Sequence, residues 1–194
     1  MKHFINVLIF LFIFALYFIT FLMIYDNFRE RKLNSQEKAA LDIYEKKVPE
    51  KEIKEEVHEV NVSYRGYTIL GRIDIPKVGI STVILKEQTY AAMSIGAIKT
   101  YGVDLNEPGG FVISAHNFRG SKPFFYPVRN LKNDDKIYIS DNKGRKMEYS
   151  VYSVSRYVAP NDTSYLTSYD GYHLTIVTCE NGGKSRIVVR AKIE

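Results

Sequence analysis

The sequence predicts an all-β domain, either a closed barrel or a sandwich, preceded by a transmembrane helix. The helix is predicted by an uncharged apolar run near the N-terminus, at residues 4–24. The β domain is predicted by short β-branched and aromatic runs from residue 63 onward, separated by turn residues. With 194 residues, 45% of them hydrophobic, the chain can form one domain with a sizeable core and an accessory segment.

The apolar run reads FINVLIFLFIFALYFITFLMI, and a helix of about 20 such residues crosses a bilayer core of roughly 30 Å. No small-residue cleavage site follows it, so residues 1–25 are predicted to be a cytoplasmic tip and an uncleaved transmembrane anchor. Lys2 precedes the run, whereas Arg29, Arg31 and Lys32 follow it. The flanking charges alone therefore leave the orientation of the helix open.

Residues 26–62 are dense in Lys and Glu and contain too few apolar side chains to fold alone. The stretch SQEKAALDIYEKK can become helical through Glu–Lys pairs one turn apart. The segment is predicted to be a charged stalk or linker. The alternative is a regulatory appendage that covers an active site.

Residues 63–194 are predicted to form the β domain. Its strand-like runs are YTILGRIDIP, STVILKE, GGFVISAH, DKIYISD, MEYSVYSVSRYV, HLTIVTC and RIVVRAKI. The sequence DNKG at residues 141–144 predicts a hairpin turn between two of these runs. One helical stretch is predicted near residues 90–98.

The single cysteine, Cys179, excludes an intramolecular disulfide and a cysteine-rich metal site. The net charge is +5, and the basic excess is spread over the C-terminal part without a Lys/Arg run. Such a diffuse charge is not the footprint of a nucleic-acid binder, so no nucleic-acid partner is predicted.

Cys179 ends the run HLTIVTC, and Arg186 opens the next run after a glycine turn. If residues 180–185 close an antiparallel hairpin, Cys179 and Arg186 face each other with Cβ atoms about 4.5–5.5 Å apart. The same register places Arg190 opposite Thr175. An arginine beside a thiol favours the thiolate and offers donors to an oxyanion, as acyl transfer requires.

Such a nucleophile also needs a proton carrier, usually histidine. His3 lies at the membrane end, His58 in the charged stalk, and His173 about 20 Å from Cys179 along an extended strand. His116 follows an apolar run and opens a polar loop, so it is the favoured partner. A lone cysteine on an apolar strand is more often an inert core residue. A membrane-tethered β-barrel binding module with a structural cysteine is therefore the alternative to a thiol enzyme.

These residues resemble the motifs of sortases, the membrane-anchored cysteine transpeptidases of Gram-positive bacteria. In that family a strand ends in T-[LI]-x-T-C, and an arginine opens the next strand before β-branched residues. Here the chain reads TIVTC at 175–179 and RIVV at 186–189. GRIDIP at 71–76 is similar to the opening strand of the sortase barrel. PGGFVISAH at 108–116 is similar to the segment that ends in the family histidine, with alanine where most sortases have glycine before it.

The resemblance implies a closed sortase-type barrel of about eight strands with one or two short helices. It also implies roles for the site residues. Cys179 would attack the Thr–Gly bond of an LPxTG-like sorting signal and form a thioacyl enzyme. His116 would protonate the leaving amine, and Arg186 would hold the substrate and stabilise the oxyanion. Thr178 would line the site beside the thiol.

The implied partners are an LPxTG-type surface protein and, as acceptor, an amine of a peptidoglycan precursor or a pilin lysine. No metal or other cofactor is required. Some sortases use calcium, but the acidic loop residues Asp104 and Glu107 are more typical of a solvated turn. Because sortase substrates lie outside the cell, the resemblance implies a single-pass protein of the cell membrane with an extracellular catalytic domain.

The sequence fits a class A-, D- or E-like sortase best, and class D is favoured. An Asp-Pro-aromatic lid motif is missing before the barrel, which argues against the lidded, pilus-building class. The segment between Val158 and His173 is also too short for the insert helix of the haem-related class. A pilin-polymerising sortase is the alternative.

Overall fold

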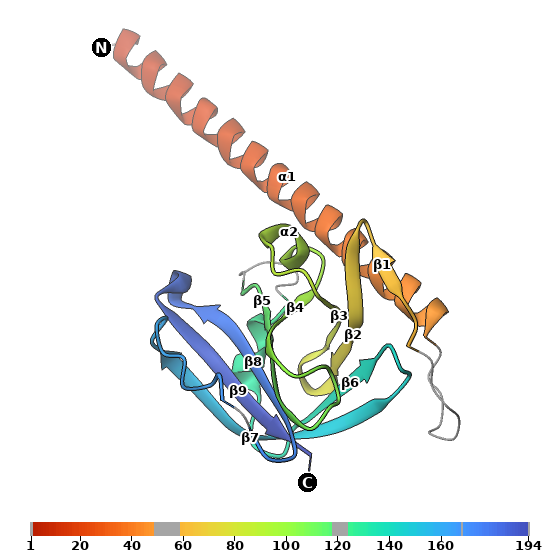
Figure 1. Cartoon of the computed structure of the whole chain (residues 1–194). Helices are drawn as coiled ribbons and strands as arrows, with labels where there is room; N and C mark the ends of the chain where they lie inside the picture. Colours follow the sequence, from red (N-terminus) through yellow and green to blue (C-terminus); the bar gives the residue numbers. More distant parts are fainter. Residues whose placement is uncertain (1, 49–58, 118–123, 168, 194) are drawn as a thin grey trace.

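A computed structural model of the chain describes residues 2–48, 59–117, 124–167 and 169–193. One β-sheet curls until its ends meet, and a long N-terminal helix lies against one side of it (Figure 1). The predicted all-β fold is therefore confirmed, and it is a closed barrel rather than a sandwich.

The strands are β1 (Val62–Tyr64), β2 (Tyr67–Ile75), β3 (Ile80–Leu85), β4 (Ala97–Gly102), β5 (Gly109–Ala115), β6 (Lys136–Asp141), β7 (Lys146–Val158), β8 (Tyr172–Glu180) and β9 (Ser185–Lys192). The helices are α1 (Lys2–Lys47) and α2 (Tyr90–Met93). Three short 3₁₀ turns are η1 (Pro76–Val78), η2 (Tyr126–Asn130) and η3 (Asn181–Gly183).

The strand order is β1-β2-β3-β4-β5-β8-β9-β7-β6, and β6 pairs back onto β2 to close the barrel. The closed barrel thus contains the eight strands from β2 to β9, while β1 is a short hairpin partner of β2. Most neighbours are antiparallel, but β3 and β4 run parallel, and so do β5 and β8. Because parallel strands end at the same edge, the C-terminal ends of β5 and β8 lie together.

The barrel interior is filled by alternate residues of each strand, as the period-2 pattern requires. Ile73, Ile113, Leu174 and Ile176 belong to this core and are almost completely buried. The predicted hairpin at 141–144 is confirmed as the β6–β7 turn. Gly144 adopts a φ of 76° there, in the left-handed region that favours glycine.

The structure differs from the expected stalk, because α1 continues without a break from the apolar run through residues 26–47. Ala40 and Tyr44 of its last turns, and Val48 directly after it, belong to a second apolar cluster, shared with β1, β2, β3 and α2. These residues recur every four positions, so they lie on one face of the helix. The Tyr44 hydroxyl also donates to the Asp141 carbonyl at 2.9 Å. This part of the expected linker is therefore packed onto the barrel, and the division expected at residue 62 falls inside β1.

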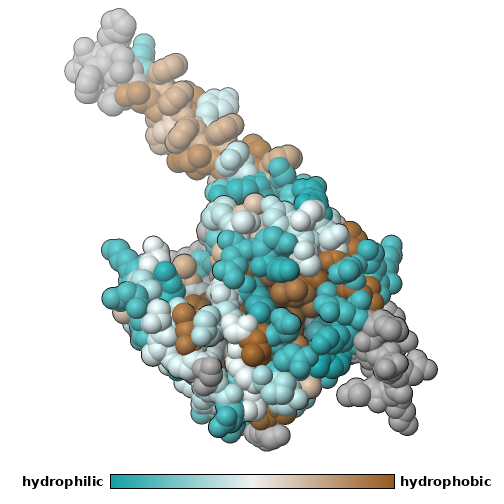
Figure 2. Space-filling view, in the orientation of Figure 1, coloured by the Kyte–Doolittle hydropathy of each residue, from teal (hydrophilic) through white to brown (hydrophobic). Residues whose placement is uncertain are grey.

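The first half of α1 makes no such contacts. Its large apolar side chains between Ile9 and Phe28 are exposed (Figure 2). It is the one helix in the described part of the chain that is long and apolar enough to cross a membrane. The predicted helical stretch at 90–98 is shorter than expected, because β4 already begins at Ala97 and pairs with β3.

Candidate active site

Cys179 lies at the C-terminal end of β8, and its side chain is exposed on the outer face of the barrel. Strand alternation explains this position, since Leu174 and Ile176 point into the core and the odd-numbered residues point outward. The predicted hairpin register is confirmed: Cys179 pairs with Arg186, and Thr175 pairs with Arg190.

His116 directly follows β5, whose last residue, Ala115, pairs with Thr178 of β8. One position further along these parallel strands, His116 and Cys179 stand side by side on the same face. The fold thus places His116, Cys179 and Arg186 on three neighbouring strands at one edge. His173 is the second residue of β8, where it pairs with Lys192 at the far end of the hairpin, as expected.

An open cavity of about 640 Å³ surrounds this edge of the barrel. It is lined by His116, Asn117, Tyr126, Arg129, Cys179, Glu180, Asn181, Gly182 and Gly183. This volume is within the range of about 300–1,000 Å³ that small-molecule and peptide side-chain sites occupy. The cavity therefore offers both the thiol and the imidazole to one ligand.

An apolar strip runs from the cavity along the outer face of β5, β8 and β9. Its floor is formed by Val112, Val177 and Val188, which are buried although they point away from the barrel interior. Residues of the β7–β8 connection, Tyr165 and Leu166, pack against this floor. The β7–β8 connection covers these valines, so they stabilise the sheet next to Cys179 and are not exposed to a ligand.

Burial lowers the pKa of the half-buried His116 below its usual value near 6.5. This shift favours the neutral imidazole, which can accept a proton. Its ring packs against the ring of Tyr90, with the centroids 4.7 Å apart and the planes tilted by 58°. Tyr90 is the first residue of α2, and its contact fixes one side of the imidazole.

Replacing Tyr90 by alanine is expected to lower kcat about tenfold, because the imidazole loses a ring contact of about 1 kcal/mol that restricts its orientation. Tyr90→Phe keeps the ring and is expected to retain nearly full activity. Steady-state kinetics of both variants with one peptide substrate provide the measurement. Equal losses in the two variants would show that the hydroxyl, and not the ring, is what matters.

A hydrogen-bonded chain connects the cysteine strand with η2. The Asn117 amide donates to the carbonyl of Cys179, and its oxygen accepts from Arg129 Nη2 at 3.3 Å. Arg129 in turn lies over the ring of Tyr126, with its guanidinium carbon 4.0 Å from the ring centroid. These contacts hold Asn117, the residue after His116, against the strand end that carries the thiol.

Glu180 anchors the other side of Cys179. Its carboxylate is buried and accepts from Arg156 Nε of β7 at 2.9 Å. The chain then turns through η3, in which Gly182 and Gly183 adopt φ values of 65° and 88°. Left-handed backbone favours glycine, so the Gly-Gly pair lets β9 start within hydrogen-bonding distance of β8.

Arg186 lies across from the thiol, but its guanidinium is turned toward the turn. Nη1 donates to the carbonyls of Gly183 at 2.9 Å and Ser185 at 3.0 Å. These bonds occupy only one of the three guanidinium nitrogens, and an arginine carries five N–H donors. The turn whose residues Asn181, Gly182 and Gly183 line the cavity thus fixes the guanidinium, which has further donors to offer.

Thr178, which was predicted to line the site beside the thiol, is not among the residues that line the cavity. Thr178 shares the inward-pointing face of β8 with Leu174 and Ile176, so its side chain is 2% exposed. Its hydroxyl donates to the carbonyl of Ala115 at 2.8 Å. Thr178 therefore ties β8 to β5 behind the site, immediately beside the residues that carry chemistry.

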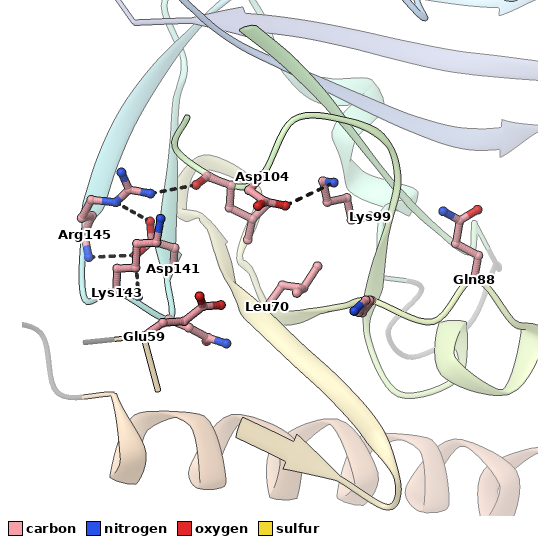
Figure 3. A pocket seen from close by; sticks show the side chains of 11 residues that line it. Glu59, Leu70, Gln88, Lys99, Asp104, Asp141, Lys143 and Arg145 are labelled. Carbon is pink, nitrogen blue, oxygen red and sulfur yellow. Dashed lines mark hydrogen bonds and ion pairs between the residues drawn. The ribbon is translucent and has the colours of Figure 1, made fainter. Parts of the chain in front are cut away.

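The acidic loop at residues 104–107 lies before β5, at the end of the barrel opposite His116. Glu107 accepts from Lys143 at 3.0 Å and Arg145 at 2.8 Å, which lower its pKa. In the adjoining cavity, Lys99 points toward Asp104, and Arg145 binds Asp141 at 2.7 Å (Figure 3). Basic side chains already neutralise these carboxylates, so the loop does not fit a calcium site. Among the described residues, no cluster of three metal-ligating side chains occurs.

Several site residues were not found by sequence reasoning. Tyr90 lies in a stretch for which only a helix was predicted, and Asn117 and Arg129 follow the histidine without a motif of their own. Glu180, next to the cysteine, was taken only as part of the loop. Glu180 could have been noticed because it is a carboxylate at the end of an otherwise apolar strand. A carboxylate that is buried there requires a charged or hydrogen-bonding partner.

The closed eight-stranded barrel brings a thiol, an imidazole and a guanidinium to one strand edge, and these are the groups that thiol acyl transfer requires. The sequence profile of the Sortase domain matches residues 73–194, which is more than half of the chain. The chain therefore belongs to the sortase family, whose members are cysteine transpeptidases.

Two relatives support this assignment. The chain is 29% identical over 119 residues to Sortase A of Bacillus anthracis, covering 61% of this chain and 56% of the relative. It is 23% identical over 118 residues to Sortase A of Listeria monocytogenes, covering 61% of this chain and 52% of the relative. The matched region thus spans about half the length of these relatives.

Among solved structures, the chain is similar to a Clostridium perfringens Sortase D5 transpeptidase. The two share 26% sequence identity and superpose with a TM-score of 0.63. The alignment covers 82% of this chain and 99% of the other. The similarity therefore includes the barrel and part of the chain that precedes the Sortase domain match.

Proposed function

We propose that the protein is a cysteine transpeptidase that cleaves an LPxTG-like sorting signal between Thr and Gly and transfers the acyl part to an amine. The observation that carries this proposal is the arrangement of Cys179 between His116 and Arg186 on neighbouring strands of a sortase barrel. The exposed thiol argues against the alternative of a binding module with a structural cysteine, since such a residue would be buried.

The reaction begins with neutral His116, which accepts the thiol proton of Cys179. The thiolate attacks the threonine carbonyl, and the C–N bond to glycine breaks as the imidazolium returns the proton to the leaving amine. The acyl group is then held as a thioester on Cys179. An incoming amine loses a proton to His116 and attacks the thioester, which forms the new amide and regenerates the thiol.

Arg186 stabilises the negative charge that develops on the carbonyl oxygen in both steps. Its hydrogen bonds to the carbonyls of Gly183 and Ser185 hold the guanidinium against the turn before the substrate arrives. A donor that is already oriented reorganises little in the transition state, which is why such donors are effective.

Arg186→Ala is expected to lower kcat by about 10²–10³, as for the loss of an oxyanion donor. Lys184→Ala is the matched control, because Lys184 is an exposed cation of the same turn and is expected to leave the rate unchanged. Pre-steady-state acylation rates of the two variants provide the measurement. A similar loss in both would remove the specific role given to Arg186.

The substrate assignment is tested with the full chain in detergent or nanodiscs and a panel of LPxTG-type peptides. Release of the glycine-containing fragment is expected, and an added amine should appear in the transferred product. A panel in which no peptide is cleaved, although the thiol reacts with alkylating reagents, would overturn the proposal.

The proposed acceptor is an amine of a peptidoglycan precursor, or a pilin lysine in a polymerising enzyme. We place the catalytic domain outside the cell with α1 as a single-pass anchor, because surface-protein substrates are found there. The similarity to a class D sortase structure at 26% identity supports a class D-like enzyme.

A further inference from the structure

The direction of α1 relative to the barrel is fixed by contacts at its C-terminal end. Tyr44 binds the carbonyl of Asp141 at the β6–β7 turn, and Glu45 forms an ion pair with Arg72 of β2. The buried face at Ala40 and Tyr44 adds apolar contacts to these polar ones. The helix cannot swing away from the barrel without losing this set of interactions together.

The β6–β7 turn lies at the end of the barrel opposite the candidate active site. In the strand register, Lys192 lies beside the start of β7 and Arg186 beside its end. From the β6–β7 turn, α1 runs back toward the active-site end, where α2 joins the same apolar cluster through Ala92 and Met93. Figure 1 shows α2 and the blue turn η3 on the side of the barrel nearer the N-terminal half of α1.

The distance from the docked face to the apolar run is short. Ile24 ends the uncharged run, and Glu37 is the first buried residue of the docked segment. The 13 residues from one to the other span only about 20 Å of helix. Because the barrel extends along α1 from this docked segment toward the apolar run, it must come close to the bilayer surface.

The active-site end carries side chains that suit a lipid headgroup layer. Tyr90 of α2 is 71% exposed, and Tyr157 near the end of β7 is 68% exposed. Tyrosine rings with a polar tip are typical of membrane–water interfaces. The exposed cation of Lys184 in the adjoining turn adds attraction to anionic lipids.

We infer that α1 is a rigid spacer that holds the Cys179 end of the barrel against the phospholipid headgroups. As a consequence, which rests on the proposed function, the length of α1 between the bilayer and the barrel determines how strongly the enzyme prefers a membrane-tethered peptide to the same peptide free in solution.

Two single-cysteine variants of the full chain test the placement in nanodiscs of phosphatidylcholine and phosphatidylglycerol. Both carry Cys179→Ala, so that the spin label attaches only to Lys184→Cys or to Lys192→Cys. These exposed positions lie at the two ends of β9, about 26 Å apart along the strand. A nickel chelate attached to the lipid headgroups should therefore enhance the spin relaxation of the label at 184 about threefold more than that of the label at 192. Equal relaxation at both positions, or stronger relaxation at 192, overturns the inference.

A second variant separates the spacer from the barrel itself. Seven helix-forming residues inserted between Asn27 and Phe28 add about two turns and lift the barrel by about 10 Å. The difference between the labels at 184 and 192 is then expected to shrink. In the enzyme with Cys179 intact, cleavage of a lipid-tethered peptide should fall severalfold while cleavage of the free peptide is retained.

The spin-label comparison and the peptide-cleavage assay can fail independently of each other. The spin-label comparison needs no turnover, so it stands even if the peptide panel shows no cleavage. If the label at 184 approaches the headgroups but tethered and free peptides respond alike to the insertion, the membrane contact holds and the preference for membrane-held substrates is wrong.

Discussion

Cys179→Ala is expected to abolish cleavage and transfer, because no other thiol exists in the chain to form the thioester. The loss should exceed about 10⁴-fold, since the covalent step is removed entirely and not merely slowed. The measurement is release of the glycine fragment by the full chain with the best peptide of the panel.

The variant should leave the fold intact. Cys179 is exposed on the barrel surface, and surface substitutions change stability by about 0.5 kcal/mol or less. An unchanged thermal unfolding transition is the matched control. Residual transfer by folded Cys179→Ala protein would mean that the thiol is not the nucleophile.

His116→Ala is expected to lower kcat by about 10²–10⁴, which is the usual contribution of general acid–base catalysis. Added imidazole should restore part of the activity, because the variant leaves space for it in the open cavity around Cys179. A loss without any rescue and with an altered unfolding transition would indicate a structural role instead.

The titration of His116 has a predictable sign. Burial disfavours the imidazolium, so its pKa in the folded protein lies below the unperturbed value near 6.5. In Cys179→Ala protein, where the thiol no longer couples to the ring, NMR signals of His116 should titrate with a midpoint below about 6.5. A midpoint above that value would show that a charge stabilises the imidazolium and that desolvation does not dominate.

Much of the site could be predicted because strand geometry is simple. Side chains alternate with a period of two, so the turn after Cys179 was enough to place Arg186 opposite it. His116 was found by elimination, and the parallel pairing of β5 and β8 then brought it beside the thiol. Thr178 shows the limit of resemblance. The alternation of β8 already placed it with Leu174 and Ile176 on one face, which is the buried one.

The docking of α1 could not be predicted from its own residues. Ala40, Tyr44 and Val48 are three apolar positions in a segment dominated by charge, and they are buried only because the barrel offers a complementary cluster. The contact of Tyr90 with His116 joins the first residue of α2 to the residue after β5, and no local pattern connects the two. Such contacts depend on tertiary packing, whereas the strands themselves follow from hydrophobic periodicity.

The account depends most directly on a thioacyl intermediate at Cys179. Intact-protein mass spectrometry of the full chain, quenched in acid during turnover of an LPxTG-type peptide, measures it. We expect an adduct of the mass of the peptide up to threonine, located on Cys179 and removed by hydroxylamine. Cleavage without any such adduct, or an adduct of the same mass on the Cys179→Ala protein, would contradict the account.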